Sequence, residues 1–146
     1  MSVLEQLQQE IEQMRDSYER GGSINTLKYQ MSCYAYSFMV YLSEQGLEVK
    51  LVEDDLPIVD EVFVQIADLP SDGFERWMNM VAGFVGLVME RCLHGEWTYV
   101  ADLDDHGHVA MAFDGNSVML VDDLKLLCEK QGSVVDYYQQ IKVNLS

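Results

Sequence analysis

Residues 101–113, ADLDDHGHVAMAF, hold the densest group of side chains in the chain that could do chemistry. Asp102, Asp104, Asp105, His106 and His108 are of the types that bind metals or transfer protons. A zinc site needs three or four converging ligands, and calcium needs regularly spaced oxygens closed by a bidentate glutamate. The stretch supplies neither set, whereas Asp and Gly are typical of hairpin loops. We therefore expect a β-hairpin loop without a metal, whose three aspartates are open to a binding partner.

A second group of reactive types, Cys92 and His94, lies two residues apart at the end of a predicted helix. The partial negative charge of a helix C-terminus disfavours the thiolate that a cysteine nucleophile needs. The chain also lacks the GxSxG, P-loop, HExxH and GxGxxG motifs. We therefore predict no catalytic residue and no cofactor.

The charge balance is strongly acidic, with 25 acidic residues, 9 basic residues and a net charge of −16. The acids are spread over both halves of the chain and do not form a tail. Such a field repels the phosphates of nucleic acids and anionic lipid, so neither nucleic acid nor a membrane surface is expected as a partner. It favours a basic protein partner, although acidity can also serve solubility alone.

The remaining composition indicates one cytoplasmic domain over residues 1–146. The three cysteines form no CxxC pair and are expected to be reduced thiols. The N-terminus, MSVLEQLQQE, is acidic and helical in pattern, unlike a signal peptide. The longest apolar run, residues 81–89, is far shorter than the roughly 20 residues that a membrane span needs.

Apolar residues at intervals of three and four predict a helical hairpin over residues 1–46. Ser2 and Glu5 have the spacing of a capping box, and Gly21 and Gly22 end the first helix. Ser23 is expected to cap the second helix, which Gly46 closes. The predicted inward stripes are Leu4, Leu7, Ile11, Met14 and Tyr18, then Ile24, Leu27, Met31, Tyr34, Phe38 and Tyr41 or Leu42.

Residues 47–94 are expected to form a short strand and two further helices. The strand is 47–52, and a helix capped by Asp54 or Asp55 follows it, with Pro57 in its first turn. The long helix runs over about 72–94 and contains Gly83 and Gly86 in its middle, where glycine costs roughly 1 kcal/mol relative to alanine. This cost predicts that another helix or the sheet packs closely there.

The period changes from 3.6 to 2 after residue 95, which predicts a three-stranded antiparallel meander over 96–103, 108–113 and 118–121. Asp122 or Asp123 is expected to cap a helix to about residue 130, and Ser133 to start the last helix. The fold class is therefore α+β, with N-terminal helices packed on a small sheet and with C-terminal helices. Each of the first two strands is expected to place one set of residues on one face of the sheet: Trp97, Tyr99, Ala101 and Leu103, then Val109, Met111 and Phe113. The last helix is expected to run through the apolar positions Tyr137, Ile141 and Val143.

Tyrosines are concentrated in the second helix. At helical spacing Tyr34 and Tyr41 belong to the core, whereas Tyr29 and Tyr36 lie seven apart on another face, with Cys33 between them. Exposed tyrosines are favoured at protein interfaces. We therefore predict that Tyr29 and Tyr36 bind a partner and that acidic residues form the rim around them.

From about residue 48 to 142 the chain resembles a family of small uncharacterised bacterial proteins with immunity-like members. The resemblance rests on VKLVEDDLPIVDEVF, on AGFVGLVMERCLHGEW, on an Asp-Gly hairpin and on LKLLCEKQGSVVDYYQQI. In that family a glycine-containing helix precedes a Gly-x-Trp element, here Gly95 and Trp97, which opens the sheet. The family often has Gly-Glu in the long helix, whereas Leu87 follows Gly86 here. The resemblance implies no activity, but similar small acidic proteins act as immunity or adaptor proteins beside bacterial toxins and secretion systems.

The sequence thus favours a non-enzymatic, acidic protein-binding module, acting as an inhibitor or adaptor of a basic partner. The alternative is a small-ligand-binding or enzymatic domain, with a pocket between the 72–94 helix and the sheet around Trp97. A homodimer is left open by the sequence.

Overall fold

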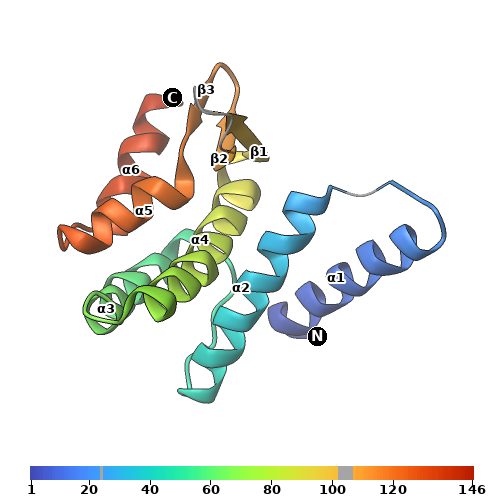
Figure 1. Ribbon diagram of the computed structural model, residues 1–146, viewed down its shortest axis with the longest axis horizontal. Coiled ribbons are helices and arrows are strands. Elements are labelled where there is room, and N and C mark those ends of the chain that lie inside the picture. The colour runs from blue at the N-terminus through green and yellow to red at the C-terminus, as the bar shows by residue number, and fades with distance from the viewer. Residues whose placement is uncertain (24, 102–106) are drawn as a thin grey trace.

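The computed structural model describes residues 1–23, 25–101 and 107–146. In this part of the chain a helical hairpin comes first, a small antiparallel sheet later, and two helices last (Figure 1), which confirms the predicted α+β class. The helices are α1 (Val3–Glu19), α2 (Thr26–Glu44), α3 (Leu56–Ile66), α4 (Ser71–Leu93), α5 (Leu120–Glu129) and α6 (Val134–Asn144). The strands are β1 (Glu96–Ala101), β2 (Gly107–Phe113) and β3 (Asn116–Val118).

Helix α4 lies at the centre of the molecule, and its residues 81–89 are all buried. A Cβ atom on Gly83 would strike the carbonyl oxygen of Met31 and the backbone nitrogen of Ala35 in α2. A Cβ atom on Gly86 would strike the indole ring of Trp97 in β1. The close packing predicted at these glycines is therefore confirmed, with a helix at one and the sheet at the other.

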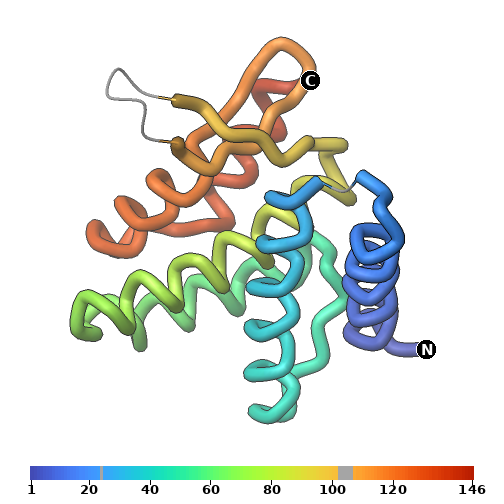
Figure 2. The backbone as a smooth tube through the Cα atoms, turned by 45° about the vertical axis from the view of Figure 1, so that its right-hand side comes forward, coloured from blue at the N-terminus to red at the C-terminus, as the bar shows by residue number. Residues whose placement is uncertain are grey.

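The sheet has the order β1-β2-β3, and Trp97 pairs with Met111 while Tyr99 pairs with Val109. Trp97 and Met111 are buried, whereas Tyr99 is 56% exposed and Ala101 is exposed as well. Tyr99 and Ala101 alternate with Trp97 along β1 but are exposed, because β1 extends beyond the part of the sheet that the helices cover. Figure 2 shows this end of the hairpin projecting from the helices.

Two predicted strands differ from the structure. In one segment a side chain binds the backbone N–H groups, and in the other a helix begins early. Residues 47–52 form no strand: the Asp55 carboxylate accepts hydrogen bonds from the backbone N–H groups of Lys50 (2.8 Å) and Val52 (3.2 Å). The Asp55 side chain thus holds the segment before it, through the short 3₁₀ turn η1 (Glu53–Asp55), and does not cap α3. The third strand is only Asn116–Val118, since Leu120 already begins α5.

The helix caps are partly as predicted. Ser2 accepts a hydrogen bond from the Glu5 N–H, and Ser133 accepts one from the Asp136 N–H. The cap of α2 is Asn25 and not Ser23, because the Asn25 side chain accepts from the Lys28 N–H at 3.0 Å. Ile24, predicted to face inward, lies outside the described residues.

The ends of the predicted apolar stripes also differ from the structure. Tyr18 is 64% exposed on α1, and Val143 is 63% exposed on α6. Tyr138, which was not among the predicted core residues, is fully buried, so the inward face of α6 is rotated relative to the predicted one.

The helices are arranged around the α2–α4 pair. Helix α1 lies along α2 at one end of the molecule, while α3, α5 and α6 lie at the other end (Figures 1 and 2). Among the described residues, none of the helices has both the length and the apolar character that crossing a membrane requires.

Candidate protein-binding surface

The clearest hollow near the predicted tyrosines lies between α1 and α2, with a volume of about 290 Å³. We call it the α1–α2 groove. Tyr36 lines it, and both Tyr29 and Tyr36 are half-buried against the edge of the core. Both side chains are therefore partly exposed, and their binding to a partner stays a prediction. The residues that define the groove are Ile11, Glu12, Arg15, Cys33, Tyr36 and Ser37.

Tyr29 and Tyr36 have different surroundings. The Arg15 Nε donates a hydrogen bond to the Tyr29 hydroxyl at 3.2 Å, which ties Tyr29 to α1. This hydrogen bond raises the pKa of Arg15, so the guanidinium is charged at every physiological pH. Tyr36 lies in the groove itself. Of the two predicted tyrosines, Tyr36 is therefore the one that a partner can reach without breaking a contact to α1.

Acidic side chains of α1 lie at or near the groove. Glu12 lines the groove, and Asp16 lies one turn further along α1. Glu19 lies close enough to Arg15 to act on its charge. All three carboxylates are exposed, so they present negative charge to an approaching molecule. The sequence pattern does not single out Arg15 or Glu12, although their spacing from Ile11 places both on the flank of the buried stripe of α1.

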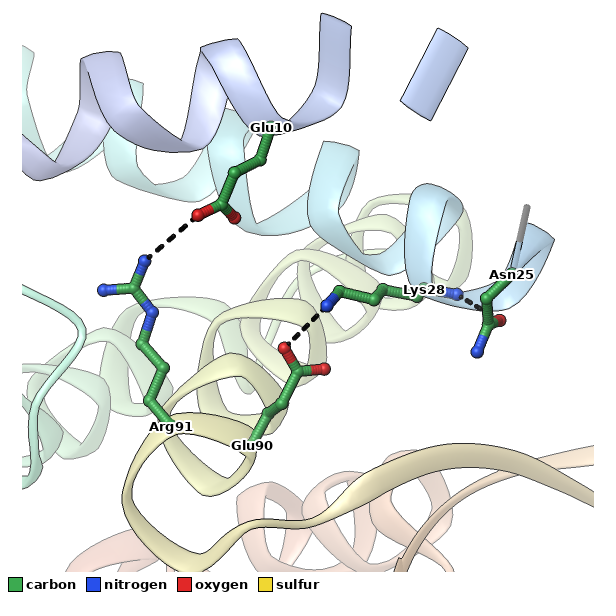
Figure 3. A network of polar contacts seen from close by, with 5 residues as sticks. All are labelled: Glu10, Asn25, Lys28, Glu90 and Arg91. Atoms are coloured by element: carbon green, nitrogen blue, oxygen red, sulfur yellow. Dashed lines mark hydrogen bonds and ion pairs between the residues drawn. The ribbon is translucent and has the colours of Figure 1, made fainter. Parts of the chain in front are cut away.

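Several basic residues form ion pairs between different elements of the fold. Ion pairs link Lys28 to Glu90 (3.0 Å) and Arg91 to Glu10 (3.8 Å), so that α4 is joined to both α2 and α1 (Figure 3). Two further pairs join other elements: Lys125 with Glu75 and Lys142 with Glu53. Within the described ranges, four of the nine bases therefore pair with acids of the same chain, and the chain keeps a large excess of acids.

Most of the predicted acidic site in the first hairpin lies outside the part of the chain that the structure describes. Asp102, Leu103, Asp104, Asp105 and His106 lie outside the described residues, so the role of the three aspartates stays a prediction. His108 is described, and its Nδ1 lies 2.6 Å from Asp122 Oδ2. Asp122 therefore joins α5 to β2, which corrects the prediction that Asp122 caps α5.

Asp123, the other predicted cap of α5, also makes a tertiary contact instead. Its carboxylate accepts a hydrogen bond of 2.6 Å from the Tyr137 hydroxyl in α6. Burial and this hydrogen bond together raise the pKa of Tyr137 well above its ordinary value. Among the residues that the structure describes, no side chain caps the N-terminus of α5.

The residues considered for chemistry are not brought together. His94 is exposed at the left-handed C-cap of α4, and Cys92 is half-buried in the last turn. Within the described ranges, no group of three or more His, Cys, Asp or Glu side chains is arranged to hold a metal ion.

Side chains lie against the backbone at two places where α4 meets the sheet. The Trp97 indole lies directly over Gly86, and Met111 and Phe113 lie against Gly95. The ligand pocket around Trp97, which was predicted as the alternative, stays a prediction.

Comparisons of the chain with protein-family models, with curated proteins and with solved structures give no match. The resemblance to the family of small bacterial proteins therefore stays an expectation drawn from the motifs, and the site has to be interpreted from its own geometry.

Proposed function

We propose that this chain is a non-enzymatic acidic binding module whose α1–α2 groove receives a basic segment of a protein partner. It acts as an immunity-like inhibitor or as an adaptor of that partner. The observation that carries the proposal is the half-buried Tyr36 in a groove beside the exposed carboxylate of Glu12. A tyrosine of this kind supplies contact area at low cost in conformational entropy.

The chemistry of the groove suits a lysine or arginine from the partner. A cation over a tyrosine ring is attracted by the electrons of its face, by roughly 0.5–1 kcal/mol at an exposed site. The acids of α1 add long-range attraction, which raises the rate of encounter with a positively charged surface. The free thiols of Cys33, Cys92 and Cys128 are consistent with a protein that works in the reducing cytoplasm.

Site-specific photo-crosslinking in cells that carry the gene tests this proposal. A photoreactive amino acid replaces Ser37, an exposed residue of the groove, and crosslinked proteins are identified by mass spectrometry. The expected product is one basic protein, and Tyr36→Ala added to the same chain should strongly reduce its yield.

The matched control places the same photoreactive residue at Gln139, an exposed position on α6 far from the groove. If Gln139 captures the same protein as efficiently as Ser37, or if the Ser37 product is not basic, the proposed function is wrong.

A further inference from the structure

Arg15 places a positive charge in the groove that we propose for a basic partner. It lines the α1–α2 groove together with Glu12. Glu12 and Glu19 lie three residues before it and four residues after it on α1, at the spacing where helices form ion pairs. Within the described ranges, however, the ion pairs of the chain do not include Arg15. Its charge is therefore available to a partner.

A hydrogen bond fixes the direction of the Arg15 side chain. The Arg15 Nε donates to the Tyr29 hydroxyl at 3.2 Å, and Tyr29 is half-buried against the core. This contact uses one of the five N–H donors of the guanidinium. The N–H groups on Nη1 and Nη2 make no hydrogen bond or ion pair with a residue that the structure describes. Their planar fork matches the two oxygens of a carboxylate, so Arg15 is oriented to bind one.

Glu12 and Arg15 give the α1 wall of the groove two opposite charges about one helical turn apart. Tyr36 and Ser37 line the groove from α2. A partner segment that carries only basic residues would place one of them against Arg15, where like charges oppose binding. A segment with a base beside Glu12 and an acid beside Arg15 satisfies both charges. The order of charges on α1 therefore selects among basic segments.

We infer that Arg15 is a specificity-determining residue of the α1–α2 groove. It binds a carboxylate of the partner's segment, about one helical turn from the lysine or arginine that Glu12 and Tyr36 bind. The inference rests on the proposed function, and it adds an aspartate or a glutamate to the chemistry of the partner. The carboxylate accepts charge-assisted hydrogen bonds from the two terminal nitrogens of Arg15. The partner is thus basic overall but carries an acid at the point of contact.

Two helical peptides built on the same background of alanine and glutamine are the probes. Each carries a lysine and, four residues after it, either a glutamate or a glutamine. Lysine before glutamate is the order that pairs less well within a helix, so both charges stay available. The peptides are titrated into isotope-labelled protein, and amide NMR shifts show where and how tightly each binds. We expect the largest shifts at Glu12, Arg15, Tyr36 and Ser37, and about threefold to fivefold tighter binding of the glutamate peptide, as for an exposed ion pair.

The net charge of −16 opposes this preference, because it attracts the more positive glutamine peptide. Tighter binding of the glutamate peptide therefore requires a cation at the binding site. Arg15→Gln should remove the preference or reverse it, and Tyr29→Phe should reduce it, because the hydroxyl that orients Arg15 is lost. Arg20→Gln is the matched control, since it makes the same change of charge at an exposed residue at the end of α1 outside the groove. It should leave the preference unchanged.

Equal affinities of the two peptides for the parent would overturn the inference, as would a preference that Arg15→Gln leaves unchanged or that Arg20→Gln removes equally. Shifts that lie only outside the groove would overturn it as well. Two peptides that bind in the groove with equal affinity would leave the proposed function standing, since a basic residue is then sufficient. The proposed function fails separately, if the protein crosslinked through Ser37 is not basic or does not depend on Tyr36.

Discussion

At the level of single residues, the atoms packed against Gly83 and Gly86 in the middle of α4 leave no room for a side chain at either position. Gly83 faces backbone atoms of α2, which cannot move without displacing that helix, and Gly86 faces the ring of Trp97, a residue that is 6% exposed. The sequence predicts that something packs closely here because glycine weakens a helix interior. It does not reveal which element does so. The atoms that face Gly83 belong to Met31 and Ala35, far away in the sequence, and Trp97 faces Gly86 because the chain reverses its direction after α4.

We expect Gly83→Ala to lower the free energy of unfolding by roughly 1–3 kcal/mol, because the added methyl group forces the backbones of α4 and α2 apart. Gly86→Ala should also destabilise the protein, since the Trp97 ring has to shift. Gly73→Ala in the same helix is the control: Leu69 is 3.8 Å from the added Cβ, so alanine fits and should stabilise slightly. Urea denaturation measures all three, and a Gly83→Ala protein as stable as Gly73→Ala would contradict the packing.

Two adjacent tyrosines of α6 have opposite hydrogen-bonding states. Tyr137 donates to Asp123, whereas the buried hydroxyl of Tyr138 lies near Glu53 and Cys92 and makes no hydrogen bond of ordinary geometry within the described residues. Burial raises the pKa of Tyr138 well above its ordinary value of ten, and the nearby charge of Glu53 raises it further. A group whose pKa is raised by folding contributes stability that is lost when the pH rises above its unfolded value.

We therefore expect the free energy of unfolding to fall above about pH 10, the value at which the unfolded tyrosines begin to ionise. Tyr138→Phe should be neutral or stabilising at pH 7, since it removes an unpaired hydroxyl, and should reduce the alkaline loss. Tyr137→Phe is the comparison, and it should cost about 1–3 kcal/mol at pH 7 through the lost hydrogen bond to a carboxylate. Urea denaturation at pH 7 and about pH 11 measures the free energy of unfolding of the parent and both variants. The prediction fails if Tyr138→Phe is as destabilising at pH 7 as Tyr137→Phe.

At the level of elements, α6 is positioned by a residue of α3. The Asp60 carboxylate accepts hydrogen bonds from the Val134 N–H (2.6 Å) and from the Ser133 hydroxyl (2.8 Å). Asp60 thus satisfies a free N–H at the start of α6, while Ser133 caps the next turn through the Asp136 N–H. The two helices are thereby fixed to each other at one point.

Asp60→Ala should lower the free energy of unfolding by about 1–3 kcal/mol, because a backbone N–H and a hydroxyl both lose their charged acceptor. Glu61→Ala, the exposed neighbour on the same helix, is the control and should change stability by only a few tenths of a kcal/mol. Thermal and urea unfolding of both variants measure the difference. Equal effects would show that the contact does not stabilise the folded chain.

The local patterns of the sequence predict most helices and the meander, because each has its own apolar period and turn residues. The Ser2 and Ser133 caps are predicted for the same reason, since both partners lie within three residues. Asp55, Asp122 and Asp123 look like helix caps in sequence but serve contacts elsewhere. Local spacing cannot distinguish these cases, because an aspartate accepts hydrogen bonds equally well from its own helix and from a distant residue.

The candidate site was predicted less completely than the fold. The sequence indicates Tyr29 and Tyr36 as a pair on one helix face, but their burial depends on where α1 lies. The hydrogen bond from Arg15 to Tyr29 and the cavity beside Glu12 arise only when the hairpin closes.

At the level of the whole molecule, the net charge of −16 and the pairing of bases between elements make the surface acidic. Each of the four described ion pairs joins two different elements, so the bases stabilise the arrangement and do not form a basic surface. The remaining acids attract basic partners over distances set by the Debye length, about 8 Å at physiological ionic strength. Under the proposed function, recognition then depends on the α1–α2 groove, where Tyr36 is within reach.

The most direct test of the central claim is the kinetics of association with the basic protein captured from the groove. Stopped-flow measurements over a range of salt compare the parent with Tyr36→Ala and with Tyr18→Ala, a tyrosine that is 64% exposed on α1 outside the groove. We predict that salt slows association of all three chains, and that only Tyr36→Ala dissociates faster, by at least about tenfold. An association rate that does not depend on salt, with the same dissociation rate for Tyr36→Ala as for Tyr18→Ala, would contradict the claim.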